Sequence, residues 1–460
     1  MATCATATTE CGPIELQARL PRANPSQPGP ERSDRAEVCC RSSRILVEDG
    51  GVEPNETAHV QVSPKWNDSR TNSFRVGAAF WSLLVMGAND AAYGLERYYN
   101  LTYTDVSLVF ISPFAGHILS AVLNNYLHLK IGQRGIAMLC GGCHILAYVV
   151  IACHPPYIAL IFAFVFAGSG NGFGDAAWNA WMGNMANASE LLGFMHACYG
   201  IGGIFSPLIA TAMITKWNLP WYIFYYIMIG FSAFELLSLT WAFWAADGAS
   251  YRGVYRENEI EQELGLTSAI FRMPAARTSW LCAFFLLCYV GIEVSLGGWI
   301  VVFMTKVRGG EPFASGMAAT GFWLGITLGR AVLGFVTPRL GVKTAIATYI
   351  AATMGLELLF WLIPQFYVSA VAVAFQGFFL GPLFPGIVLV ASKLLPRHQH
   401  VVVIGFAAAL GGCGAAILPF AVGILAQVSG VQVLQPIILS LLGVLLLLWL
   451  SLPRINKRRE

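Results

Sequence analysis

The sequence predicts an all-α membrane protein with about twelve transmembrane helices. Of its 460 residues 56% are hydrophobic and only 12% are charged, whereas about a quarter of the residues in a soluble domain are charged. The mean hydropathy is +0.61. The apolar residues also fall into blocks of roughly 20, the length of helix that crosses a hydrocarbon core about 30 Å thick. Composition and block length therefore both indicate a polytopic membrane protein.

The apolar blocks divide into two groups of six, separated by a polar interval. We expect helices to begin near Val76, Asp105, Gly135, Tyr157, Leu191 and Pro220, and then near Ser279, Ala314, Val342, Phe366, Val401 and Val431. This pattern predicts five segments: a disordered cytoplasmic tail over 1–74, a six-helix bundle over 75–246, a cytoplasmic linker over 247–278, a second six-helix bundle over 279–452, and a basic cytoplasmic tail over 453–460.

Loop charges predict the orientation in the membrane. With the N-terminus inside, most loop Lys and Arg residues lie on the cytoplasmic side, as the positive-inside rule requires. Asn100, in an N-x-T sequon, then falls on the outer side and is the candidate glycosylation site. We expect an integral multi-pass protein of the plasma membrane, with the vacuolar membrane or another endomembrane as the alternative.

A short repeat supports two parallel halves. Lys130-Ile-Gly132-Gln-Arg134 follows the second block, and Arg339-Leu-Gly341-Val-Lys343 follows the eighth. Both segments read basic-x-Gly-x-basic at an expected tight turn, where glycine permits a sharp chain reversal. Recurrence at the same place in each half is typical of transporters built from repeated bundles.

The segment from Gly334 to Lys343 resembles the loop motif of the major facilitator superfamily. An Asp normally precedes the basic residue in that motif, whereas Pro338 stands there in this chain and Leu129 stands there in the first half. The resemblance implies two parallel six-helix repeats and transport by alternating access. Because Asp is absent at both positions, the sequence gives little support for the motif's acidic gating role in this chain.

Placing an ionisable side chain inside the membrane costs free energy, so each such residue in an apolar block indicates a functional or structural role. Asp90 lies in the first block beside Asn89, and Asp175 lies in the fourth after glycines at 168, 170, 172 and 174. We expect those glycines to form one face for close helix contact. Trp178 and Asn179 follow Asp175 by three and four residues and should share its face. A carboxylate, an amide and an indole together suit a polar, ring-shaped ligand such as a sugar.

Asn89-Asp90 and Asp175-Ala-Ala-Trp-Asn179 resemble matching segments of the L-fucose permeases, in the fucose/galactose/glucose:proton symporter group. There an Asn-Asp pair lies in the first span, and an acid precedes Ala-Ala-x-Asn in the fourth. The resemblance implies sugar binding and coupling for Asp90, and proton carriage for Asp175, which replaces a Glu. The stretch from Tyr289 to Met304 is similar to the seventh span of eukaryotic members, which implies that Glu293 faces the cavity.

The candidate residues fall into two overlapping sets. The candidate substrate-binding residues are Asn89, Asp90, Trp178, Asn179, His196, Glu293, Trp299 and Gln376, and the candidate proton-coupling residues are Asp90, Asp175 and Glu293. For each of them the alternative is a hydrogen bond that only fixes helix packing. For Glu235 and Glu357 the packing role is the preferred interpretation.

These observations predict a secondary active transporter that moves a small polar solute, sugar or polyol-like, by alternating access with proton coupling. A proton-driven exporter of a cellular or secondary metabolite is the alternative, followed by a non-transporting nutrient sensor. No G-x-S-x-G, H-E-x-x-H or phosphate-loop motif is present, so we do not expect an enzyme. The Cys140-x-x-Cys143 pair has no second pair to complete a zinc site. We expect no metal, no cofactor and no nucleic-acid partner, and a monomer that contacts substrate, protons and membrane lipid.

Overall fold

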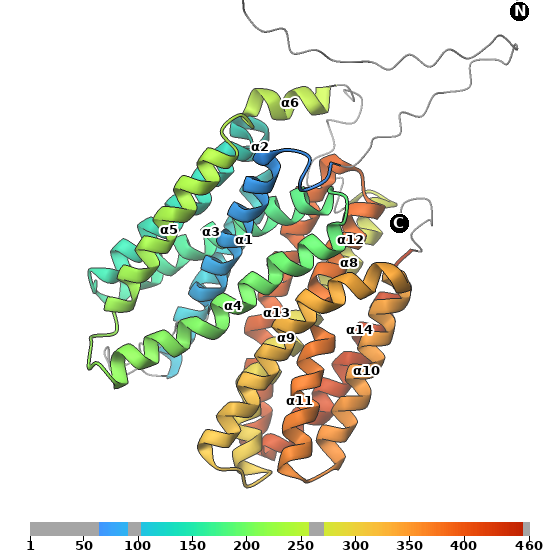
Figure 1. Cartoon of the computed structure of the whole chain (residues 1–460). Helices are drawn as coiled ribbons and strands as arrows, with labels where there is room; N and C mark the ends of the chain where they lie inside the picture. Colours follow the sequence, from blue (N-terminus) through green and yellow to red (C-terminus); the bar gives the residue numbers. More distant parts are fainter. Residues whose placement is uncertain (1–63, 91–102, 257–270, 454–460) are drawn as a thin grey trace, which may run out of the picture. The chain divides into compact units, whose positions relative to one another are not determined.

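The computed structural model describes residues 64–90, 103–256 and 271–453, which all lie in one compact unit, Gln61–Glu460 (Figure 1). Every regular element in these described ranges is a helix, so the predicted all-α class is confirmed. Most of the predicted tails at 1–74 and 453–460, part of the predicted linker, and the sequon at Asn100 lie outside the described residues.

Five long helices precede the polar interval, and one short helix lies at its start. They are α1 (Arg70–Asp90), α2 (Tyr103–Ala152), α3 (Tyr157–Gly183), α4 (Ala188–Thr215), α5 (Ile223–Ala242) and α6 (Gly248–Arg256). Pro155 and Pro156 separate α2 from α3, because the proline ring fixes φ and removes a backbone donor. We refer to α1–α5 as the N-half.

Helices α8 to α14 form the C-half. They are α8 (Ala275–Lys306), α9 (Pro312–Leu340), α10 (Val342–Leu362), α11 (Phe366–Leu380), α12 (Leu383–Leu394), α13 (His400–Ser429) and α14 (Leu434–Ser451), with 3-10 turns at Arg397–Gln399 and Val431–Val433. Gly381 and Pro382 divide α11 from α12. Pro312 occupies the first turn of α9, where its missing N–H is not needed.

Ten described helical segments are long and apolar enough to cross a membrane. One of them, Ile111–Ala152, spans 42 residues, or about 63 Å at 1.5 Å per residue, far more than one crossing needs. Its backbone is non-helical at Gly132, with φ 70° and ψ −173°. Counting two crossings in α2 and one in α1 is consistent with the twelve predicted spans.

The two predicted glycine turns are both present. Gly132 and Gly341 have φ values of +70° and +78°, in the left-handed region that favours glycine. Gly132 separates the two arms of α2, and Gly341 separates α9 from α10. The sequence repeat therefore corresponds to a repeat of backbone conformation at equivalent points of the two halves.

The N-half and the C-half meet along α4 and α9, which run beside each other in Figure 1. A Cβ added to Gly193 would lie 2.4 Å from the backbone oxygen of Arg330, and one added to Gly200 would lie 2.3 Å from Thr327 Oγ1. Further contacts join Ser189 Oγ to the Gly334 carbonyl at 3.0 Å and Asn184 Nδ2 to His400 Nδ1 at 3.1 Å. Small residues thus allow close helix contact between the halves.

Replacing Gly132 by alanine should destabilise the protein. The left-handed backbone costs a residue with a Cβ about 1–2 kcal/mol, and the new Cβ would lie 2.3 Å from the carbonyl carbon of Asp247. We expect Gly132→Ala to lower the apparent melting temperature in detergent. Gly142→Ala is the matched control on the same helix, because nothing lies within 4 Å of its Cβ position. Equal melting temperatures for the two variants would contradict this account of the turn.

Candidate functional site

Asp90, the last described residue of α1, is held by three helices. Its Oδ1 accepts hydrogen bonds from Asn89 Nδ2 at 3.0 Å and from Asn171 Nδ2 of α3 at 2.8 Å. Its Oδ2 accepts one from the Tyr199 hydroxyl of α4 at 2.8 Å. The neighbouring Asn89 is 2% exposed. The structure therefore joins Asn89 to Asp90 and adds two partners that the sequence analysis did not single out for Asp90.

Asp175 and Asn179 of α3 form a second cluster with His196 of α4. Asn179 Nδ2 donates to Asp175 Oδ1 at 2.6 Å, as expected for residues four apart on one helix face. Asn179 Oδ1 lies 2.9 Å from His196 Nε2. Within the described part of the chain Asp175 forms no ion pair. Its carboxyl group is thus hydrogen-bonded to a neutral amide.

Glu293 of α8 forms a buried ion pair with Arg330 of α9. Their side chains lie 2.9 Å apart and are only 7% and 4% exposed. Arg330 Nη2 also lies 3.4 Å from the Tyr289 hydroxyl. Pairing is what makes a buried charge tolerable, because taking either ion out of water alone costs several kcal/mol.

Arg330 connects this ion pair to the N-half. Its Nη1 donates to the His196 carbonyl at 3.4 Å, and its guanidinium lies 5.8 Å from the centre of the Tyr199 ring. The Tyr199 hydroxyl in turn bonds Asp90, and His196 bonds Asn179. The three clusters therefore meet around one cation at the boundary between the halves.

Sequence reasoning missed Arg330, although the signal was available. It stands in the apolar run "LGITLGRAVLGF", and an arginine in the middle of a span is as costly as the acids that were considered. Asn171 was also overlooked, because an asparagine inside a glycine-rich run reads as a packing residue.

Three predicted binding residues lie apart from this centre. Trp178 is fully buried and stacks on Phe243, the residue that directly follows α5, with ring centres 4.9 Å apart. Trp299 donates from Nε1 to the Pro419 carbonyl at 3.1 Å. Gln376 donates to Glu357, which is fully buried between α10 and α11. The structure thus places Trp178 inside the N-half, and Trp299 and Gln376 inside the C-half.

The glycines of α3 do not form the single face that the sequence analysis expected. A Cβ on Gly168 would meet the Pro113 carbonyl, one on Gly170 would meet the His144 ring, and one on Gly174 would meet Met86 of α1. Residues two apart on a helix point in nearly opposite directions, because each turns by about 100°. The glycines therefore let α3 approach α1 and both arms of α2.

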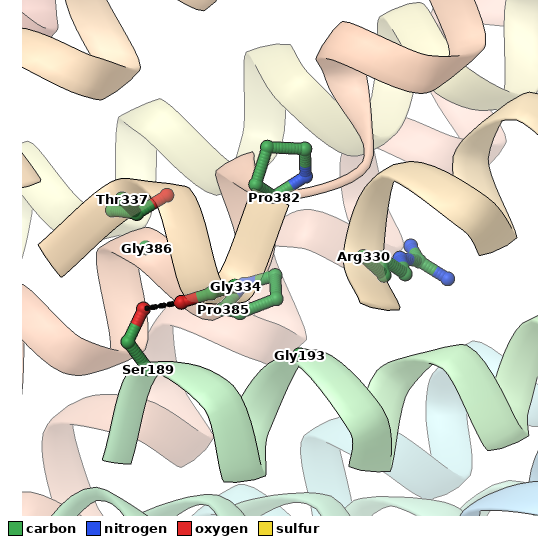
Figure 2. A pocket seen from close by; sticks show the side chains of 8 residues that line it. All are labelled: Ser189, Gly193, Arg330, Gly334, Thr337, Pro382, Pro385 and Gly386. Atoms are coloured by element: carbon green, nitrogen blue, oxygen red, sulfur yellow. Dashed lines mark hydrogen bonds between the residues drawn. The ribbon is translucent and has the colours of Figure 1, made fainter. Parts of the chain in front are cut away.

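A small pocket lies beside Arg330, where α4, α9 and α12 meet (Figure 2). Its lining includes Ser189, Gly193, Arg330, Gly334, Thr337, Pro382, Pro385 and Gly386. Figure 2 shows the hydrogen bond from the Ser189 side chain of α4 to the Gly334 carbonyl of α9. The pocket therefore lies at the contact between the halves and next to the charged centre.

A sequence profile described as "Major Facilitator Superfamily" matches residues 76–318 and 296–460. The chain belongs to the major facilitator superfamily. It is therefore a multi-pass membrane transporter of the secondary type, and the sequence-based resemblance to this superfamily is confirmed. Members of the superfamily are transporters rather than enzymes, which supports the expected absence of enzymatic activity.

Two curated relatives extend the comparison. "Bypass of stop codon protein 6" of Saccharomyces cerevisiae (strain ATCC 204508 / S288c) is 27% identical over 417 residues, which are 84% of this chain and 84% of that protein. The "Glucose/mannose transporter GlcP" of Bacillus subtilis (strain 168) is 20% identical over 343 residues, which are 71% of this chain and 80% of that protein.

Two solved structures share the fold. FucP in the outward conformation aligns with TM-score 0.65 and 13% identity, covering 82% of this chain and 97% of that one. The human organic anion transporter MFSD10 aligns with TM-score 0.67 and 13% identity, covering 83% and 100%. At these identities the structures show the common fold alone.

The Glu293–Arg330 pair should show strong coupling between its two charges. Arg330→Met leaves a buried carboxylate without its cation, a change that typically costs about 3–5 kcal/mol. We expect a large fall in the apparent melting temperature, and we expect the added Glu293→Gln change to restore part of it. Simply additive losses in the double variant would contradict the ion pair.

Proposed function

We propose that this transporter couples the movement of a small polar solute, sugar or polyol-like, to the movement of protons. One observation carries the proposal. Three carboxyl groups and one guanidinium meet at the boundary between the halves, and only Glu293 among the three carboxyl groups is paired with the cation. Asp90 and Asp175 are left with neutral hydrogen-bond donors.

The charge balance favours proton binding. If all three carboxyl groups were ionised, the centre would carry two negative charges beyond the single positive charge of Arg330. An ionised carboxylate away from water and without a cation is costly. A proton on Asp175 removes that cost, because within the described residues the Asp175 carboxyl group is hydrogen-bonded to the neutral Asn179 amide and to no cation. Asp175 is therefore the proposed proton carrier. Asp90 and Glu293 are the proposed groups that both bind the solute and couple its movement to the proton on Asp175.

The geometry also favours a neutral solute with hydroxyl groups. Asn89, Asp90, Asn179 and His196 offer both donors and acceptors within one region, whereas the single cation is already engaged by Glu293. Two relatives agree with this solute class: GlcP is named a glucose/mannose transporter, and FucP is described as a fucose:proton symporter. Uptake is the proposed direction, and export by proton exchange is the alternative that the same assay tests.

Alternating access needs a contact between the halves that opens and closes. The Gly193 and Gly334 backbones lie against each other across α4 and α9, with 3.7 Å between the Gly193 Cα and a Cβ placed on Gly334. Arg330 is one turn from Gly334 on α9. A proton or solute that changes the pairing of Arg330 would thus act directly on this contact.

Asp175→Asn should abolish accumulation of solute and leave exchange intact. Liposomes with an inward proton gradient are offered fucose, glucose and mannose in turn. We expect the wild type to accumulate at least one of these sugars and the variant to reach only the equilibrium level. Counterflow of the same sugar should remain measurable, because an amide preserves the hydrogen bonding but cannot carry the proton.

Glu357→Gln is the matched control. It removes another fully buried carboxyl group that is bonded to an amide, but one enclosed within the C-half. We expect it to accumulate the sugar as the wild type does. Accumulation by Asp175→Asn would refute the assignment of the carrier, and solute leaving liposomes against its own gradient would support the exporter instead.

A further inference from the structure

A second buried hydrogen-bond network lies in the N-half, beside the centre described above. His144 of α2 and Glu235 of α5 lie 2.7 Å apart between Nδ1 and Oε2, and both side chains are 0% exposed. Glu235 Oε1 accepts from the Ser82 hydroxyl at 2.5 Å and from the Cys140 thiol at 3.5 Å. His144 Nε2 lies 3.0 Å from Asn171 Oδ1.

Asn171 joins this pair to Asp90. Its Nδ2 donates to Asp90 Oδ1 at 2.8 Å, so its Oδ1 must be the atom that faces His144. An amide oxygen only accepts hydrogen bonds. His144 Nε2 therefore carries a hydrogen, and the orientation of one amide fixes the tautomer of a histidine on another helix.

The fixed tautomer implies that the pair holds an extra proton. With hydrogen already on Nε2, the short contact to Glu235 requires a second hydrogen between Nδ1 and Oε2. The pair is thus either imidazolium with carboxylate or neutral imidazole with carboxylic acid. Without that proton, lone pairs would face each other at 2.7 Å in a site from which water is excluded.

We propose that His144 and Glu235 form a second proton-binding site, which exchanges its proton with Asp90 when the Asn171 amide rotates. In the rotated arrangement Asn171 Nδ2 donates to a bare His144 Nε2, and Asn171 Oδ1 accepts from a protonated Asp90. The N–H bond at His144 Nε2 is broken and an O–H bond at Asp90 Oδ1 is formed. Nδ1–H continues to donate to the Glu235 carboxylate, so no proton enters or leaves.

The two arrangements also carry the same charge. Before the transfer, the Asp90 and Glu235 carboxylates and the His144 imidazolium sum to −1. Afterwards only the Glu235 carboxylate is charged, and the sum is again −1. This proposal rests on the proposed coupling role of Asp90, and it adds a donor that supplies or recovers its proton inside the N-half.

Other titratable groups surround the network. From α2 these are His117, Cys140, Cys143 and Tyr148, from α3 Asp175, from α4 Tyr199, and from α5 Tyr225. The thiol of Cys140, the His144 ring and the Glu235 carboxyl group could also hold a metal ion, since their ligand atoms lie within 4.8 Å of one another. The hydrogen bonds that the same atoms already make favour a proton there.

Nitrogen NMR of purified protein labelled with ¹⁵N-histidine tests the proposal without solute or gradient. The signals missing from His144→Gln identify His144. We expect a protonated Nε2 in the wild type and a bare Nε2 in Asp90→Asn. Without the Asp90 carboxylate, the Asn171 amide is free to rotate and the positive charge on the His144 ring is no longer stabilised. Asn171→Leu should independently give a bare Nε2, because that nitrogen loses its acceptor.

Tyr199→Phe is the matched control. It removes one hydrogen bond from Asp90 but neither its charge nor its contact with Asn171, so Nε2 should stay protonated. A protonated Nε2 in both Asp90→Asn and Asn171→Leu would overturn the proposal and leave a static ion pair. Stoichiometric zinc in the purified protein, lost in Cys140→Ala, would also overturn it. Neither result depends on whether the protein transports a sugar.

Discussion

The rest of the site depends on one buried cation that must remain paired. Arg330 lies in α9 at the boundary between the halves, 3% exposed, and its pairing with Glu293 offsets the cost of removing both ions from water. The same guanidinium contacts the His196 backbone and the Tyr199 ring of the N-half. A change in charge at Asp90 or Asp175 therefore alters the electrostatic field around a group that contacts both halves. This arrangement would give the proposed proton binding a physical route to movement of the helices.

The two halves divide the chemistry unequally. The N-half supplies Asp90, Asp175 and their amide partners, whereas the C-half supplies the ion pair. The proposed His144–Glu235 proton site also lies in the N-half, where Asn171 connects it to Asp90. The corresponding region of the C-half holds the Glu357–Gln376 contact, a carboxyl group with an amide. The repeated fold is thus retained in both halves, while the network that leads to Asp90 occurs in the N-half.

The architecture could be predicted from the sequence because the bilayer imposes a length and a polarity on each span. The expected starts near Tyr157, Val342 and Phe366 coincide with helices α3, α10 and α11, and the two glycine turns have the backbone conformation that glycine permits. Spacing also placed Asn179 on the face of Asp175. It could not place Trp178, since a side chain three residues from Asp175 can turn toward α5 as well as toward a ligand. The Asn171 and Tyr199 partners of Asp90, and the side-chain partners of Glu235, come from other helices. No spacing within one helix reveals them.

The proposed coupling requires solute and proton to move together through this centre. Liposomes with a pH-sensitive dye inside and equal pH on both sides test it most directly. When fucose, glucose or mannose is added outside, the account predicts that entry of the transported sugar acidifies the lumen of wild-type liposomes, because each solute brings a proton inward. Entry of the sugar with no change of internal pH would contradict the account, since the carboxyl groups around Arg330 would then have no part in coupling.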